Sequence, residues 1–196
     1  TFAYPEMGGA PDICLVIESH TAVLWQLKPA EAVSHEGETD VAKAIEAICK
    51  RMGRRFENNG VKAKISNQYL DNTELGKIQQ IAAAANIDVY IDNETVAITP
   101  KGQPRMIDVP IVSSTTGLIG YPIPDLQGVK LQCLYDKALR FGGLIEVAGS
   151  LIEQCNGRWR VFGLSLDLES QTPGGKWLAD IKAANVEDTN AKVATK

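Results

Sequence analysis

The sequence is poor in the side chains that most often carry chemistry. Of its 196 residues only two are histidines, His20 and His35, and neither has the spacing of a metal ligand. Both lie in loop-like sequence near the N-terminus, which predicts exposed loop residues rather than acid–base groups. The cysteines are far apart and form no C-x-x-C pair: Cys14, Cys49, Cys133 and Cys155. The first three lie in apolar patterns, and this predicts small buried side chains in a reducing compartment rather than a disulfide or a metal site.

Long hydrophobic runs and a strong excess of charge are also lacking. No apolar run approaches the roughly 20 residues that a membrane-spanning helix needs, so the sequence predicts no spanning segment. The formal net charge of -4 argues against tight binding of nucleic acid through its phosphates, and a mildly acidic surface would let nucleic acid pass. With 44% hydrophobic and 22% charged residues, the chain is long enough for one large globular domain or two small ones.

Catalytic motifs are missing as well. The hydroxyl residues at 113–116 have no G-x-S-x-G elbow around them and predict hydrogen bonding within a loop. Gly117 and Gly120 lack the lysine of a phosphate-binding loop and lead to a proline, which indicates a tight turn. Asp167 and Glu169 alternate on a predicted strand; such a pair can act on a glycoside, but a solvated strand face is the more ordinary cause. The sequence therefore predicts no catalytic residue, no metal site and no cofactor.

The N-terminal part of the chain predicts two adjacent strands and a linker. The runs 12–19 and 22–28 are apolar, β-branched or aromatic, and His20-Thr21 separates them. The polar, acidic segment 29–40 indicates a linker into a new unit. Residues 1–5 lead at once into strand-like sequence without a basic and apolar leader, so we expect no signal peptide and a further N-terminal region upstream.

Two amphipathic helices are predicted in the middle of the chain. The first begins with Thr39 as its N-cap and stops at Gly53, and the second is capped by Asn72 or Thr73. Apolar residues recur at helical spacing on one face of each helix. The first stripe consists of Val41, Ile45, Ile48 and Met52, and the second of Leu75, Ile78, Ala82 and Ala85.

A β-hairpin is predicted after each helix. The predicted strand pairs are Phe56 with 61–65 and 87–91 with 96–98. The two helix–hairpin units align at an offset of 33 residues, which matches Ile45 with Ile78. We therefore predict one compact α+β domain over 35–103. Four basic residues follow the first helix, where the helix dipole favours cations and nucleic-acid contact is the weaker alternative: Lys50, Arg51, Arg54 and Arg55.

Short strands separated by glycine and proline turns are predicted beyond this domain. They are 107–111, 128–135, 144–152, 158–169 and 177–181. The longest has an apolar side made of Phe162, Leu164, Leu166 and Leu168. A series of short strands with regularly spaced turns indicates a β-barrel or a β-sandwich. The polar tail 186–196 is predicted to be disordered.

Several short segments occur in this chain in the order and at the spacing of a known family. They are Asn58-Asn59-Gly60-Val61, the runs 83–88, 98–102 and 116–122, Gly142-Gly143 with 144–147, the run 157–161, and 168–170 with 173–177. In these segments, from about residue 12 to residue 184, the chain resembles the tail baseplate hub proteins of long-tailed bacteriophages. Those proteins seat the central spike beneath the tail tube.

The resemblance implies an α+β fold: an antiparallel, tail-tube-like β-barrel plus a small α+β domain made of two helix–hairpin repeats. The implied domains are the closing strands of a first β-barrel with a linker, the helix–hairpin repeats, the second β-barrel and a polar tail. Their bounds are 1–34, 35–103, 104–185 and 186–196. Three copies would form a ring whose six barrels match the sixfold tail tube.

The resemblance also implies a structural protein of the virion rather than an enzyme. It implies a homotrimeric hub of the tail baseplate, assembled in the host cytoplasm, that connects the tail tube or distal tail proteins to the spike. The ring would line the DNA channel, and DNA would meet it only in transit. No membrane-spanning segment is expected.

Four aromatic residues are candidate anchors of partner interfaces, with core packing as the equal alternative for each: Trp25, Tyr121, Trp159 and Trp177. Two other functions stay open. One is a cell-wall glycan-binding or peptidoglycan-degrading tail module that uses the repeat domain or the Asp167 and Glu169 face. The other is the hub of a bacterial contractile injection system.

Overall fold

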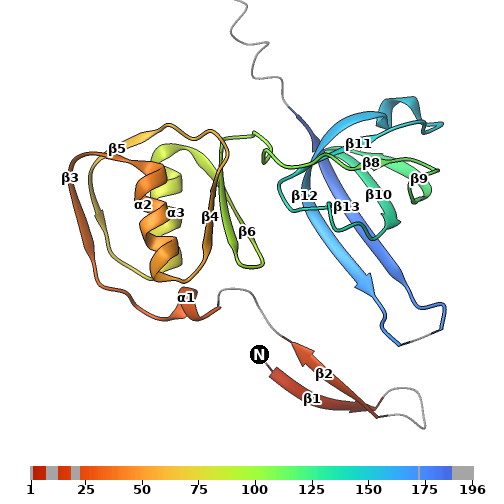
Figure 1. Cartoon of the computed structure of the whole chain (residues 1–196), viewed down its shortest axis with the longest axis horizontal. Coiled ribbons are helices and arrows are strands. Elements are labelled where there is room, and N and C mark those ends of the chain that lie inside the picture. Colours follow the sequence, from red (N-terminus) through yellow and green to blue (C-terminus); the bar gives the residue numbers. More distant parts are fainter. Residues whose placement is uncertain (1, 8–12, 19–22, 172, 187–196) are drawn as a thin grey trace, which may run out of the picture.

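The computed structural model describes residues 2–7, 13–18, 23–171 and 173–186. Within these ranges the chain is mostly β-strand, and its three α-helices gather in one half of the molecule (Figure 1). The predicted loop at His20 and nearly all of the predicted disordered tail lie outside the described residues.

The N-terminal elements are β1 (Phe2–Met7), β2 (Ile13–Glu18), α1 (Val23–Leu27) and β3 (Val33–Asp40). The middle elements are α2 (Val41–Arg51), β4 (Arg55–Asn58), β5 (Lys64–Leu70), α3 (Glu74–Ala85), β6 (Ile87–Asp92) and β7 (Thr95–Pro100). The C-terminal elements are β8 (Ile111–Val112), β9 (Leu118–Asp125), β10 (Gly128–Leu134), β11 (Leu144–Val147), the 3-10 helix η1 (Glu153–Cys155), β12 (Gly157–Leu168) and β13 (Trp177–Asn185).

The N-terminal hairpin is formed by β1 and β2, and not by the predicted pair 12–19 and 22–28. β1 and β2 are antiparallel over their whole length. The second predicted strand is wrong, because its residues form the short helix α1, whose Trp25 packs against the helical core. An apolar run this short has no periodicity that separates a strand from a helix, so packing decides between them.

The predicted linker 29–40 contains a strand. β3 pairs antiparallel with β5, and its register shifts between His35 and Glu38. The Gly37 N–H in this irregular part donates to the Asn67 side-chain oxygen at 2.9 Å. Most β3 side chains are exposed or half-buried, which explains why the strand has the composition of a linker.

The two predicted helices are confirmed as α2 and α3, and both predicted apolar stripes point into the core. The N-cap of α2 is Asp40 rather than Thr39, since the Asp40 carboxylate accepts a hydrogen bond from the Lys43 N–H at 3.0 Å. Thr73 caps α3, where its hydroxyl oxygen accepts from the Gly76 N–H at 3.1 Å.

Only the second of the two predicted hairpins forms. β6 and β7 pair antiparallel, whereas β4 pairs in parallel with β7, and β5 pairs with β3. The backbone N–H and the side-chain amide of Asn59 both donate to the Ile98 carbonyl oxygen, at 2.9 and 3.2 Å. These bonds hold the turn against β7 while Val61 enters the core, so the next strand leaves β4 and reaches β3. The two units therefore differ in strand pairing, and the predicted helix–hairpin repeat is not formed.

The C-terminal strands form one curled half-barrel sheet with the order β8-β11-β12-β13-β10-β9 (Figure 1). Among the described residues β8 pairs only with β11 and β9 only with β10, so the sheet stays open where the predicted barrel would close. β8 is short because residues 113–116 fold into the predicted hydroxyl turn. Thr116 Oγ1 accepts from the Ser113 N–H at 2.8 Å and donates to the Ile111 carbonyl at 2.6 Å.

The centre of this sheet follows the sequence pattern and its margins depart from it. The predicted strands 128–135, 158–169 and 177–181 are confirmed as β10, β12 and β13. The predicted strand 107–111 shrinks to β8, and 144–152 ends at β11 because the Asn156 side chain bonds the Ser150 backbone and closes a loop. The predicted apolar side of β12 is interrupted, since a bulge between Val161 and Gly163 removes Phe162 from the leucine face.

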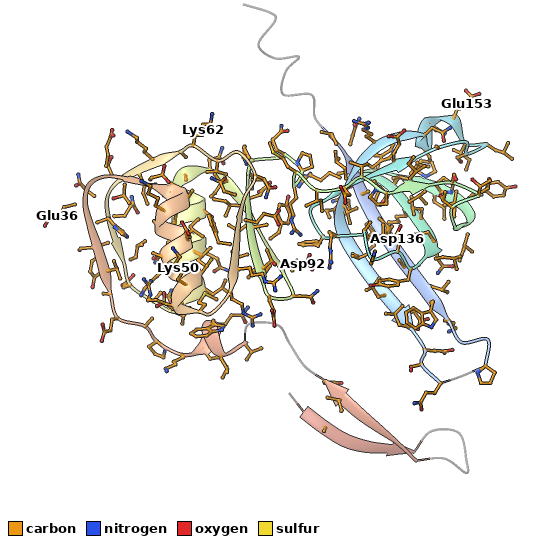
Figure 2. The ribbon with its side chains drawn as sticks, in the orientation of Figure 1. Glu36, Lys50, Lys62, Asp92, Asp136 and Glu153 are labelled. Atoms are coloured by element: carbon orange, nitrogen blue, oxygen red, sulfur yellow. The ribbon has the colours of Figure 1, made fainter. Side chains whose placement is uncertain are left out.

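Two separate hydrophobic cores result, one in the helical half and one inside the curled sheet. The helical core includes Ile45, Ile78 and Ile98, and the sheet core includes Ile145 and Ile181. Charged side chains lie on the outside, as Figure 2 shows for Glu36, Lys62 and Glu153. Asp92, in contrast, lies between the helical half and the curled sheet. No helix in the described ranges is long and apolar enough to cross a membrane.

Candidate functional site: the junction of the two cores and the exposed aromatic residues

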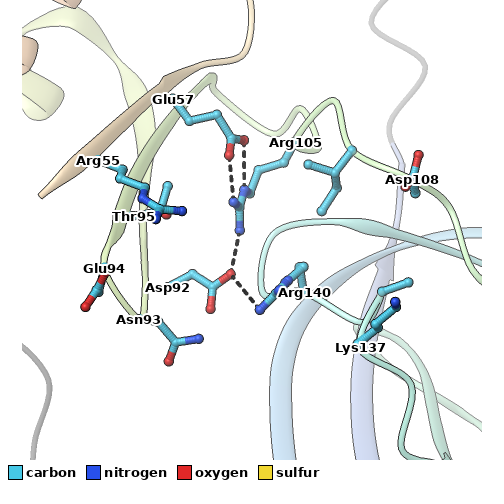
Figure 3. A pocket seen from close by; sticks show the side chains of 12 residues that line it. Arg55, Glu57, Asp92, Asn93, Glu94, Thr95, Arg105, Asp108, Lys137 and Arg140 are labelled. Atoms are coloured by element: carbon cyan, nitrogen blue, oxygen red, sulfur yellow. Dashed lines mark hydrogen bonds and ion pairs between the residues drawn. The ribbon is translucent and has the colours of Figure 1, made fainter.

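A buried arginine joins the two halves of the molecule. Arg105 lies on the segment between β7 and β8 and is only 5% exposed. Its guanidinium binds Glu57 through two hydrogen bonds, from Nε to Oε1 at 3.0 Å and from Nη2 to Oε2 at 2.8 Å (Figure 3). Nη1 donates to Asp92 Oδ2 at 3.0 Å and to the Phe141 carbonyl at 3.1 Å. One side chain thus connects β4, the end of β6 and the loop before β11.

Backbone and ring contacts surround this guanidinium. The Arg105 N–H donates to the Gly142 carbonyl at 2.9 Å, which extends the link to the loop before β11. The rings of Tyr90 and Phe141 pack edge to face with centroids 5.4 Å apart. Arg160 of β12 donates to the Tyr90 hydroxyl at 2.7 Å. The junction therefore combines a charged centre with an aromatic contact, and both halves of the chain supply its parts.

The charges of the junction stabilise one another. Hydrogen bonds from the Arg105 guanidinium lower the pKa of Glu57, although its partial burial opposes the shift. Burial on its own lowers the pKa of Arg105, but the hydrogen bonds to Glu57 and Asp92 outweigh it and raise that pKa. Burial likewise tends to raise the pKa of Asp88, and the bonds from Lys101 and the Gly102 N–H reverse this and lower it. Glu57, Arg105 and Asp88 are therefore charged at neutral pH.

We expect the junction to weaken in acid. Because the folded-state pKa of Glu57 lies below its ordinary value of 4.5, the contribution of the ion pair is complete above that value and is lost as the pH falls through the folded pKa. The thermal unfolding midpoint, followed from neutral pH down to about pH 3, should fall most steeply below that ordinary value. Glu57→Gln should lower the midpoint at neutral pH and flatten its fall in acid. An unchanged acid profile in that variant would contradict the assignment.

A polar cavity of about 700 Å³ opens beside the buried arginine, and its labelled side chains are drawn in Figure 3. Arg140 reaches into it and lies 3.9 Å from Asp92. The Glu57 carboxylate, whose pKa the Arg105 hydrogen bonds lower, is a poor proton donor at neutral pH. Among the described residues no group of three histidine, cysteine or acidic side chains gathers as metal ligands.

The four predicted interface residues lie at separate places. Trp25 and Trp159 are half-buried; Trp25 packs against the helical core, and Trp159 packs against the sheet core and donates from Nε1 to the Cys155 carbonyl at 2.9 Å. Tyr121 on β9 is 62% exposed, and Trp177 on β13 is 50% exposed. Core packing therefore accounts for the first two, and solvent-facing surface for the other two.

Several other polar residues that the sequence singled out are paired within the chain. Lys176 lies 3.4 Å from Asp167, and its N–H donates to the Glu169 carboxylate at 3.0 Å. In the basic group after α2, Arg51 binds both carboxylate oxygens of Glu74, at 2.8 and 2.9 Å. The same group contains an ion pair of Lys50 with Glu46 and a hydrogen bond from Arg54 to the Asn93 carbonyl.

The cysteines behave as small apolar side chains where the structure describes them. Cys49, Cys133 and Cys155 are free and buried. Burial raises the pKa of Cys49 and of Cys133 to about 11, and it also raises the pKa of Cys155. These thiols are protonated at neutral pH and thus are weak nucleophiles.

Sequence reasoning missed the junction entirely. Arg105 stands alone after a proline, without a periodic pattern or a motif. Its partner Glu57 is 48 residues away, and a pairing at such a distance leaves no local signal. The position of the arginine in a short connection between two predicted units was the single available hint.

The fold is similar to that of two solved tail proteins. A tail protein from Neisseria meningitidis MC58 superposes with a TM-score of 0.64 and 6% identity, over 94% of this chain and 78% of that one. The 43 kDa tail protein of prophage MuSo2 from Shewanella oneidensis gives a TM-score of 0.53 and 9% identity, over 77% of this chain and 64% of that one. At these identities the likeness concerns the fold alone.

The sequence defines the family. Residues 3–174 match the model of the family described as baseplate hub gp41, and the chain therefore belongs to that family. This confirms the resemblance to tail baseplate hub proteins that the sequence predicts. Curated protein sequences gave no match to this chain. The chain spans slightly less than two thirds of the length of the Shewanella tail protein.

Proposed function

We propose that the chain is a structural hub of the phage tail baseplate, which connects the tail tube to the central spike. The match to the baseplate hub family over residues 3–174 carries this proposal. In the proposed assembly three copies form a ring in the virion that lines the DNA channel, and the curled half-barrels form its wall. The overall charge of -4 supports a channel through which DNA passes without binding.

The proposal assigns a task to each part of the chain. The bounds 1–34, 35–103, 104–185 and 186–196 separate a first barrel remnant, the α+β domain, the second barrel and a tail. The two independent hydrophobic cores support the division between the second and third parts. Arg105 would keep these two parts in one orientation, as assembly into a regular ring requires. The junction is built from paired charges, which supports a structural rather than an enzymatic role.

The mass of the particle in solution tests the proposal. We expect sedimentation equilibrium of the purified chain to give a mass of three copies, and electron microscopy to show rings with a central opening. A strictly monomeric particle at all concentrations, even with spike protein added, would contradict the ring. Turnover of peptidoglycan by the purified chain would favour the cell-wall module instead.

A further inference from the structure

A second polar cavity lies between the helical half and the curled sheet. It has a volume of about 610 Å³ and shares no lining residue with the cavity beside Arg105. Asp88 of β6 lines it from the helical half. The curled sheet contributes Arg160 of β12, Asn185 of β13 and Gln127 of the turn between β9 and β10. We call this cavity the Arg160 pocket.

The guanidinium of Arg160 has one edge without hydrogen bonds. Its Nη1 donates to the Tyr90 hydroxyl at 2.7 Å and lies 3.9 Å from Asp88 Oδ2. Its Nε is buried without a hydrogen-bond partner, and Nη2, on the same edge as Nε, has none among the described residues either. In Arg105 and Arg51 the same edge binds both oxygens of a carboxylate. Because native proteins rarely leave a buried donor without a partner, the edge of Arg160 favours an oxyanion from outside the chain.

The charges of the pocket also favour an anion. Lys101 binds one oxygen of Asp88 at 2.6 Å, and the Gly102 N–H binds the other at 2.8 Å. Asp88 is the single acidic residue among the described residues that line the pocket, so Arg160 adds a positive charge that no further acid there balances. Nη1 faces Asp88, and the edge of Nε and Nη2 is the other side of the guanidinium. The charge is delocalised over the three nitrogens, so an anion at Nη2 also stabilises the buried Nε.

Two neutral donor groups line the same pocket. Gln127 and Asn185 are exposed, and neither side-chain amide has a hydrogen-bond partner among the described residues. Together with Arg160 they place donors on three separate elements of the chain. A carboxylate has two acceptor oxygens in one plane, whereas a phosphate has at least three that point in different directions. The arrangement therefore favours a phosphate over a carboxylate.

We propose that the Arg160 pocket binds a phosphate group. The Arg160 guanidinium is its main ligand, through Nη2, and the amides of Gln127 and Asn185 are further donors. The bound phosphate completes the hydrogen bonding of the arginine that holds Tyr90, so it stabilises the contact between the two halves. This site goes beyond the proposed hub function, and because it lies within one copy it does not depend on the ring.

Titration of the full chain with inorganic phosphate tests the site. At constant ionic strength the backbone amide signals of Gly102, Gln127 and Asn185 in NMR spectra should shift along a saturable curve. Chloride at the same ionic strength should not shift them. Arg160→Gln should weaken phosphate binding about 10-fold or more, as the loss of a charged hydrogen-bond donor does. Gln127→Ala changes an exposed residue and should weaken it about threefold, even if Arg160→Gln does not fold.

Two matched variants serve as controls. Tyr90→Phe removes the hydroxyl that Nη1 binds but keeps the guanidinium. Arg158→Gln removes a 66% exposed arginine of the same strand, which pairs with Glu146. Both should bind phosphate within about twofold of the parent chain, a difference smaller than the loss of one hydrogen bond. Circular dichroism checks that each variant folds.

The remaining outcomes would overturn the proposal. If no saturable shift occurs in the parent chain, the pocket binds no phosphate. Equal affinity in Arg160→Gln and the parent chain would place any bound phosphate elsewhere. If acetate binds as tightly as phosphate, the pocket is a carboxylate site and the assignment of a phosphate is wrong.

Discussion

Replacing Arg105 with alanine is expected to lower the free energy of unfolding by about 3 kcal/mol, the lower end of the range for removing one partner of a buried ion pair. The guanidinium side chain is 4% exposed, and its carboxylate partners Glu57 and Asp92 are 29% and 18% exposed. The substitution leaves both carboxylates without their main donor, while some contact with water remains. Because both acids keep part of their hydration, we expect a loss at the lower end of that range of unfolding free energies.

Urea unfolding of Arg105→Ala measures this loss, and hydrogen exchange locates it. Protection should fall on both sides of the junction, in β6 and in the loop that contains Phe141. Arg140→Ala is the matched control. Arg140 approaches the same Asp92 carboxylate, but its side chain is 45% exposed and the distance is longer, 3.9 Å. Its removal should cost less than about 1 kcal/mol, as for surface pairs. Equal losses in the two variants would show that burial of Arg105 has no special role.

A double-mutant cycle with Glu57→Ala then isolates the pair. If the two side chains act together, the double variant should lose clearly less than the sum of the single losses. The bidentate geometry at 2.8 and 3.0 Å makes this coupling the largest expected in the junction. Additive losses would mean that Arg105 acts through its other contacts instead.

The parts of the fold that the sequence predicted are those with a local signal. α2 and α3 have apolar residues at helical spacing and a capping side chain within the same segment, and both are confirmed. β10 alternates Val129, Leu131 and Cys133 toward the core, and it too is confirmed. In each of these elements the pattern within about ten residues already determines which face is buried.

The parts that were missed depend on partners far along the chain. β4 was predicted to turn back on its neighbour, but Asn59 bonds Ile98 and commits β4 to a parallel partner. α1 has the composition of a strand, and only the contact of Trp25 with the helical core determines its form. The Arg105 junction brings together three side chains and one backbone carbonyl from four separate segments. No pattern in a single segment could indicate these pairings.

For two of the aromatic residues, the predicted role as interface anchors stays a prediction, and the structure adds only their positions. Tyr121 and Trp177 were expected as interface anchors, and the structure leaves both exposed. Which face each occupies depends on the register of β9 and β13 with β10. The pairing of β9 with β10 shifts its register between Lys130 and Gln132, and this shift contributes to the arrangement. The periodicity of the sequence does not reveal an irregularity of this kind.

Replacing Gly128 with alanine is expected to destabilise the curled sheet by about 3–4 kcal/mol, through overpacking and backbone strain together. Gly128 has φ +143°, a conformation that favours glycine, and a Cβ there would lie 2.2 Å from the Ala183 carbonyl oxygen and 2.8 Å from the Cα of Ala184. These atoms belong to the backbone of β13, so no side chain can rotate away. The start of the β10–β13 pairing must therefore separate.

Urea unfolding and hydrogen exchange of β10 and β13 measure this effect in Gly128→Ala. Gly174→Ala is the matched control, because Gly174 also has a positive φ, +70°, but a Cβ there meets no atom within 4 Å. Its cost should be only the conformational one, about 1 kcal/mol. The difference between the two variants gives the steric clash with β13 together with the additional backbone strain of φ +143° over φ +70°. If Gly128→Ala costs no more than Gly174→Ala, then β10 and β13 do not approach as closely as the pairing of Gly128 with Ala184 requires.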